Sequence, residues 1–221
     1  MSGISAKVVI LGDSAIGKTR LIQRYISGRA DIQNSTLGAV FVKLEHNFKN
    51  EQGKNFNLPI QFWDTAGQER YNALIPMYVR DADFIILAFD LTNTVSFINL
   101  YRWLNFGNNT VKNTQFVLVG CKNDLTNIRR VTDEEIDSFI KKNLPSSKFF
   151  KCSAMTGENI HELFLHIKLG LEKIGENRII FNFINNKNSH GKKIVRIDDY
   201  DRLFSDNSFI ELVRVKKKCC F

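Results

Sequence analysis

The chain has 221 residues, of which 43% are hydrophobic and 24% charged, with a formal net charge of +8. This composition suits one globular domain with a tail and excludes wholesale disorder. Its 4 cysteines do not resemble the framework of a small secreted disulfide protein, and residues 1–7 lack the apolar core of a signal peptide. No stretch reaches the roughly 20 apolar residues of a membrane helix. We therefore expect a cytosolic chain that meets membranes only at its surface.

Apolar runs alternate with helical patterns along most of the chain. The apolar runs predict strands at Lys7–Leu11, Val40–Phe48, Leu58–Trp63, Phe84–Asp90, Phe116–Gly120 and Phe149–Cys152. Helical spacing predicts helices at Lys18–Ile26, 94–106, 132–143 and 159–173. Thr132 and Glu135 form a T-x-x-E capping box at the start of the third helix. The alternation indicates an α/β fold, with a mostly parallel six-stranded sheet and helices on both faces.

A phosphate-binding motif follows the first predicted strand. Residues 12–19 read G-D-S-A-I-G-K-T and match G-x-x-x-x-G-K-[ST]. The backbone N–H groups of such a loop bind phosphate at a helix N-terminus. We expect Lys18 to bridge the terminal phosphates and the Thr19 hydroxyl to bind Mg²⁺. The predicted phosphate-binding residues here are Ser14, Ala15, Ile16, Gly17, Lys18, Thr19 and Arg20. Kinases, ATPases and GTPases share this loop, so it leaves the reaction open.

A second motif, D-T-A-G-Q-E at 64–69, follows the third predicted strand and resembles switch II of the Ras-like GTPases. The resemblance implies a three-layer P-loop G domain that hydrolyses GTP slowly. Asp64 would hold Mg²⁺ through water, the Gly67 N–H would bond the γ-phosphate, and Gln68 would be the catalytic residue that orients the attacking water. Thr36 resembles the switch I threonine, a phosphate-site residue whose hydroxyl binds Mg²⁺ only when the γ-phosphate is present. Hydrolysis would then release both loops.

Guanine recognition is expected after the fifth predicted strand, where residues 121–124 read C-K-N-D and resemble the family pattern N-K-x-D. The Asp124 carboxylate would accept from guanine N1–H and the 2-amino group, and the Lys122 stem would lie along the base. Residues 153–155, S-A-M, resemble the family's S-A-K loop. The predicted guanine-binding residues are Cys121, Lys122, Asp124, Ser153, Ala154 and Met155.

Three departures from the family pattern lie on this guanine surface. Cys121 replaces the usual Asn, Met155 replaces Lys, and residues 28–31 lack the aromatic that Rab-like proteins stack on guanine. Lost polar contacts and stacking cost on the order of 1–3 kcal/mol each. We therefore expect this protein to hold nucleotide more loosely than its relatives and to exchange it faster, unless Asn123 or nearby backbone compensates.

Other stretches resemble the Rab GTPases, and above all their early-endosomal branch: Ser14-Ala15, residues 35–41 (S-T-L-G-A-V-F) and Pro76-Met77-Tyr78. Phe41, Trp63 and Tyr78 match the triad that Rab effectors read. The resemblance implies a switch in vesicle-mediated transport on the cytoplasmic face of endosomes or vesicles, cycling with the cytosol. It implies a monomer whose partners are an exchange factor, an activating protein and effectors.

The last segment, residues 177–221, is expected to be a hypervariable basic tail after a G domain at 1–176. Residues 186–221 hold nine Lys/Arg and five Asp/Glu, and the chain ends K-K-K-C-C-F. Rab proteins often end in a Cys pair, which implies geranylgeranyl groups on Cys219 and Cys220 and a prenyl-carrying escort protein. Two lipids give stable anchoring, and the lysines attract anionic lipid. Single lipidation and unmodified thiols are the alternatives.

Three other functions compete with the GTPase interpretation. A nucleotide-binding pseudo-switch that barely hydrolyses is favoured by the weakened guanine contacts and disfavoured by Gln68. A P-loop kinase is disfavoured because D-T-A-G-Q-E is foreign to that class and no Arg-rich lid is evident. A nucleic-acid binder is disfavoured because the basic residues gather beside the terminal cysteines.

Overall fold

The computed structural model describes residues 5–29, 39–49, 55–65, 73–110 and 114–189. Six strands form one sheet in the order β2-β3-β1-β4-β5-β6. Their bounds are β1 Ala6–Leu11, β2 Ala39–Lys49, β3 Asn55–Thr65, β4 Phe84–Asp90, β5 Gln115–Cys121 and β6 Lys148–Lys151. Among the described strands, β2 and β3 pair antiparallel and the other neighbours pair parallel. The predicted α/β fold with a mostly parallel six-stranded sheet is confirmed.

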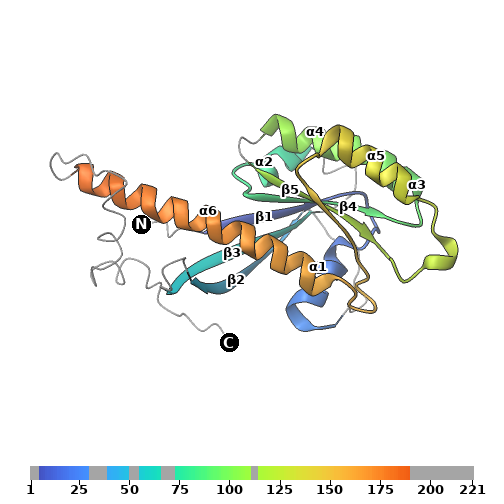
Figure 1. Ribbon diagram of the computed structural model, residues 1–221, viewed down its shortest axis with the longest axis horizontal. Helices are drawn as coiled ribbons and strands as arrows, with labels where there is room; N and C mark the ends of the chain where they lie inside the picture. Colours follow the sequence, from blue (N-terminus) through green and yellow to red (C-terminus); the bar gives the residue numbers. More distant parts are fainter. Residues whose placement is uncertain (1–4, 30–38, 50–54, 66–72, 111–113, 190–221) are drawn as a thin grey trace.

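Helices cover both faces of the sheet (Figure 1). One face carries α1 (Lys18–Ser27) and α6 (Ile160–Ser189). The other carries α2 (Ile75–Val79), α3 (Thr94–Ile98), α4 (Leu100–Thr110) and α5 (Asp133–Asn143). A short 3₁₀ turn, Thr126–Ile128, precedes α5. The structure therefore has three layers.

Two hydrophobic cores lie on the two faces of the central strands. Along β1, Val8 and Ile10 belong to the core under α1 and α6, whereas Val9 and Leu11 belong to the core under α2–α5. This follows from the period of two in a strand, which sends successive side chains to opposite faces. It explains why β1 and β4 are continuous apolar runs rather than alternating ones.

The helices differ from the sequence predictions in three places. The predicted helix at 94–106 is divided into α3 and α4, which meet at Asn99. The helix predicted to end at 173 continues to Ser189, because residues 176–189 contain neither Pro nor Gly to stop it. The expected domain boundary at 176 therefore falls inside α6. Helix α2 was not predicted, since five residues are too short for a helical period to be visible.

The predicted capping box at the start of α5 is confirmed. The Thr132 hydroxyl accepts from the Glu135 N–H, and the Glu135 carboxylate accepts from the Thr132 N–H. Within the described ranges, no helix combines the length and the apolar composition needed to cross a bilayer.

Candidate nucleotide-binding site

The candidate site lies at one edge of the sheet, where the carboxyl ends of the parallel strands meet. The phosphate loop at 12–19 follows β1, and Asp64 lies near the end of β3. The loops at 121–124 and 152–155 follow β5 and β6. Because β1, β3, β4, β5 and β6 run parallel, the fold brings these segments to the same edge.

The shape of the phosphate loop depends on its glycines. Gly12 has φ 151°, and a Cβ there would lie 2.3 Å from the Ala88 carbonyl oxygen. Gly17 has φ 109° and is the N-cap of α1, where it offers no side chain to the first N–H groups of the helix. Ala15 also has a positive φ of 61°. Positive φ values within such a loop turn successive backbone N–H groups toward one concavity, as anion binding requires.

Lys18 lies with its ammonium inside this loop. Its Nζ donates to the carbonyl oxygens of Gly12 (2.8 Å) and Asp13 (2.6 Å), and the residue is only 6% exposed. Burial lowers the pKa of Lys18 to about 8, although nearby Asp64 opposes this shift. A buried cation needs compensation, and a polyphosphate would supply it.

Thr19 and Asp64 place two oxygen donors side by side next to the loop. The Thr19 hydroxyl donates to Oδ2 of Asp64 at 2.5 Å, and Asp64 is buried. The Thr65 hydroxyl bonds the Ile10 carbonyl at 2.6 Å and so fixes the end of β3 against β1. Hydroxyl and carboxylate oxygens are the ligands that Mg²⁺ prefers, so this donor set fits the metal.

The remaining predicted phosphate residues lie at the rim or beneath it. Ser14 and Ala15 are exposed, whereas the Ile16 side chain is buried in the core, so only its backbone can serve a phosphate. Arg20 is half-buried on α1. The predicted residues Thr36, Gly67, Gln68, Cys219 and Cys220 lie outside the described residues.

The two loops predicted to bind guanine are joined by a side-chain hydrogen bond. The buried Ser153 hydroxyl donates to Oδ1 of Asp124 at 2.6 Å and accepts from the Thr156 N–H at 3.1 Å. Lys122 has φ 62°, and its ammonium lies 2.6 Å from Oδ2 of Asp90 at the end of β4. These contacts hold Asp124 and Lys122 at the same edge as the phosphate loop.

Cys121 is the last residue of β5 and lies beside the phosphate loop. Cys121 is buried, and a Cβ added at Gly17 would lie 4.0 Å from the Cβ of Cys121. Burial raises the pKa of the Cys121 thiol to about 12, so the group is a neutral, weak hydrogen-bonding partner. The Asn123 amide instead donates to Glu158 at 2.9 Å, in the loop before α6. Asn123 therefore does not fill the place of Cys121.

One further contact supports the loop after β6. Arg24 of α1 donates to the Thr156 carbonyl at 3.1 Å. The Met155 side chain is 58% exposed, so it lies at the surface of the loop, and Ala154 is half-buried. Asp90 and Arg24 were missed by the sequence reasoning, since no local pattern joins them to residues so distant along the chain.

Asp13 is a further residue that the motif alone did not single out. Its carboxylate accepts from Asn99 (2.6 Å) and from the Trp103 indole N–H (2.7 Å), both some 90 residues away in the sequence. The signal available in the sequence was an acidic residue inside the phosphate loop, where an uncompensated negative charge would oppose phosphate binding.

The three predicted effector residues lie together on β2, β3 and α2. The Phe41 and Trp63 rings are 5.3 Å apart, and the Trp63 and Tyr78 rings are 6.0 Å apart. Phe41 is 48% exposed, whereas Tyr78 is buried. The cluster thus combines an exposed aromatic ring with a buried one that supports it, a combination common at binding surfaces.

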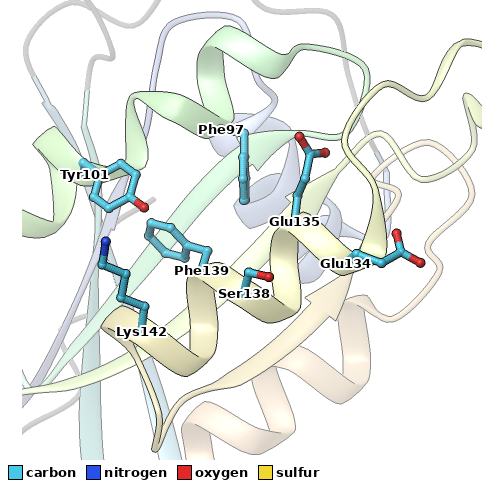
Figure 2. A pocket seen from close by; sticks show the side chains of 7 residues that line it. All are labelled: Phe97, Tyr101, Glu134, Glu135, Ser138, Phe139 and Lys142. Atoms are coloured by element: carbon cyan, nitrogen blue, oxygen red, sulfur yellow. The ribbon is translucent and has the colours of Figure 1, made fainter.

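A separate groove of about 420 Å³ lies between α3, α4 and α5 (Figure 2). Its lining residues are Phe97, Tyr101, Glu134, Glu135, Ser138, Phe139 and Lys142. The Phe97 and Phe139 rings, 5.6 Å apart, form part of it. None of these residues belongs to the predicted nucleotide site, so the groove is a distinct feature of the α2–α5 face.

The fold and the site together define a P-loop GTPase domain. The sequence profile of the Ras family matches residues 7–173. The chain therefore belongs to the Ras family of small GTPases.

Individual relatives support the Rab group. The chain is 36% identical over 177 residues to Ras-related protein RABF2b of Arabidopsis thaliana, covering 77% of this chain and 83% of that protein. It is 35% identical over 174 residues to GTP-binding protein ypt3 of Schizosaccharomyces pombe, covering 78% of each chain. It is 37% identical over 162 residues to putative ras-related protein Rab-5B of Dictyostelium discoideum, covering 73% of this chain and 72% of that protein. The predicted resemblance to Rab proteins of the early-endosomal branch is confirmed.

Proposed function

We propose that this protein binds GTP with Mg²⁺, hydrolyses GTP to GDP and phosphate slowly without an activating protein, and so regulates vesicle-mediated transport at endosomes. One observation carries the proposal: a buried lysine, a hydroxyl–carboxylate pair and a base-reading carboxylate meet at one sheet edge. They are Lys18, the pair Thr19 and Asp64, and Asp124.

The residues of the chain divide the work of binding and hydrolysis. The backbone N–H groups of residues 14–19 and the Lys18 ammonium hold the phosphates. Thr19, Asp64 and Thr36 would hold Mg²⁺, which when bound neutralises charge on the phosphate oxygens. Gln68 orients the attacking water and is the catalytic residue.

The switch itself depends on the two segments around Thr36 and Gly67. Contacts from these segments to the γ-phosphate order them in the GTP state, and hydrolysis removes those contacts. The neighbouring cluster of Phe41, Trp63 and Tyr78 then offers effectors a surface that depends on the nucleotide. An exchange factor and an activating protein complete the cycle of a monomeric switch that has no nucleic-acid partner.

Membrane attachment is the second half of the proposal. Geranylgeranyl groups on Cys219 and Cys220, delivered by an escort protein, would hold the chain on the cytoplasmic face of endosomes or vesicles. Replacement of both cysteines by Ser should leave the protein in the cytosol, because three lysines alone give weak attraction to anionic lipid. Unchanged membrane localisation of the double variant would refute lipid anchoring.

A second candidate function is a fast-exchanging, hydrolysis-poor binding module. The neutral, buried thiol of Cys121 supports this candidate, because it replaces an amide on the guanine side.

Nucleotide exchange and single-turnover hydrolysis on the purified full-length protein test both functions. Mg²⁺-dependent GDP and GTP binding, with hydrolysis that falls at least about tenfold in Gln68→Leu, supports the GTPase. Binding with no hydrolysis above that of Gln68→Leu supports the binding module. Absence of guanine nucleotide binding refutes both.

A further inference from the structure

The Asp13 side chain ties the phosphate loop to the α3–α4 junction. Oδ2 accepts from the Asn99 amide at 2.6 Å, and Oδ1 accepts from the Trp103 indole N–H at 2.7 Å. Asn99 is the residue at which α3 and α4 meet, and Trp103 is fully buried one turn further on. The donors therefore come from the α3–α4 segment, Trp103 from within the core on the α2–α5 face and Asn99 from a half-buried position at the junction.

The backbone of Asp13 contacts Lys18, whose ammonium carries the positive charge of the phosphate loop. Its carbonyl oxygen accepts from Lys18 Nζ at 2.6 Å. Asp13 is thus fixed through its carboxylate by the α3–α4 junction and by α4, and it fixes Lys18 through its carbonyl. The position of the Lys18 ammonium is set in part by residues 80 to 90 positions away in the sequence.

Charge explains why an acidic residue is tolerated so close to a polyphosphate site. A bare carboxylate in the loop would repel phosphate, and it would also be costly to hold in a partly buried place. The Asn99 and Trp103 N–H groups donate to this carboxylate, and the Arg102 guanidinium lies 4.0 Å from Oδ1. Arg102 also lies over the Trp103 ring, 4.6 Å from its centroid, which keeps it beside the carboxylate.

We propose that Asp13, Asn99 and Trp103 form a clamp that positions the phosphate loop and its lysine for the terminal phosphates of the nucleotide. None of the three touches the nucleotide in this scheme, so they are positioning residues and not catalytic ones. The inference rests on the proposed GTP-binding function. It adds to that function a specific dependence of phosphate binding on the α3–α4 junction.

The variant that tests the clamp most directly is Asn99→Ala in the full-length protein. Asn99 is half-buried, and its replacement leaves the packed Trp103 in place. Asn105→Ala, at an exposed asparagine of α4, the helix that begins directly after Asn99, is the matched control. Loss of one hydrogen bond to a carboxylate should weaken GDP binding by about tenfold in Asn99→Ala and leave Asn105→Ala unchanged. Trp103→Phe, which keeps a ring but removes the N–H donor, should act in the same direction.

Two readouts separate positioning from general loosening. The ³¹P resonance of the β-phosphate of bound GDP should shift in Asn99→Ala, because the loop around that phosphate has moved. The preference for GDP over IDP, which depends on the guanine 2-amino group at Asp124, should stay as in the unmodified protein. Equal ³¹P spectra and equal GDP release rates in the Asn99 and Asn105 variants would overturn the clamp.

Other outcomes decide the matter as well. A changed GDP-to-IDP preference in Asn99→Ala would show that the whole site has loosened, and this too would overturn the clamp. If the unmodified protein binds no GDP, the proposed function fails first. If it binds GDP and only the variant comparison fails, the clamp fails alone.

Discussion

The Ser153 hydroxyl donates to Oδ1 of Asp124 at 2.6 Å and so joins the loop after β5 to the loop after β6. Ser153 is fully buried, whereas Asp124 is exposed. A buried donor thus fixes the orientation of an exposed carboxylate. This relationship makes Asp124 the residue on which base selectivity should depend.

Asp124→Asn should change which purine base the protein prefers. In the proposed complex the carboxylate would accept from guanine N1–H and the 2-amino group, and an amide would offer donors in its place. We expect GDP affinity to fall by about tenfold to a hundredfold, since hydrogen bonds to charged groups are the stronger ones. Binding of XDP, which has a carbonyl instead of the 2-amino group, should improve. Competition titrations measure both, with Asp137→Asn on the exposed face of α5 as the control. A retained preference for GDP would contradict the assignment.

Cys121→Asn should slow GDP release. The thiol is buried and neutral beside Gly17, so an amide there would add hydrogen-bonding capacity that the thiol lacks. We expect release to slow by about threefold to tenfold, the effect of one recovered hydrogen bond. Cys121→Ala should stay within about twofold of the unmodified protein, because the thiol contributes little. Stopped-flow release of a fluorescent GDP analogue measures both rates. If the unmodified protein releases GDP as slowly as other Rab proteins do, the hypothesis of loosened nucleotide binding is refuted.

The central fold could be predicted from the sequence because its signals are local. The run Phe84–Asp90 is a strand with those same bounds, since an uninterrupted apolar run suits a strand covered on both faces. The phosphate loop was recognisable because its chemistry requires glycines and a lysine at fixed spacing. Helix α2 and the length of α6 were not predictable, because the first is too short to show a period and the second extends into a polar sequence.

The contacts between distant residues could not be predicted in the same way. Nothing near Asp13 in the sequence points to Trp103, which reads as an ordinary core residue of an amphipathic helix. The same holds for Lys122 and Asp90, which meet only because β4 and β5 are neighbours in the sheet. Such pairs meet only in the folded chain, so they can be identified only when the order of the strands and the packing of the helices are known.

Thr132→Ala should lower the free energy of unfolding by about 1 kcal/mol. The substitution removes the hydroxyl that accepts from the Glu135 N–H at 3.2 Å and so leaves a helix N–H without its cap. Urea unfolding at a fixed, saturating GDP concentration measures the change, because bound ligand adds to apparent stability. Ser138→Ala, on an exposed position of the same helix, should change stability by less than about 0.5 kcal/mol. Equal stability of Thr132→Ala and the unmodified protein would show that the cap does not contribute.

GDP affinity should fall as the pH rises above about 8. Burial lowers the pKa of Lys18 from 10.5 to about 8 in the nucleotide-free protein. Phosphate favours the charged ammonium, so binding raises this pKa and takes up a proton above about pH 8. One proton taken up corresponds to a fall of at most about tenfold in affinity per pH unit. Calorimetry in buffers of different ionisation enthalpy measures the uptake directly. Absence of proton uptake at about pH 8.5 would contradict the role of Lys18.

The same lysine should give the nucleotide-free protein the opposite pH dependence. Between about pH 8 and 10.5 the unfolded chain binds the Lys18 proton more fully than the folded chain does. The contribution of Lys18 to the free energy of unfolding should therefore rise with pH in this window. GDP affinity should fall over the same window. Lys18→Arg keeps its charge at all these pH values, so it should lose both dependences together. If only one of them disappears in Lys18→Arg, the titrating group is not the ammonium held by Gly12 and Asp13.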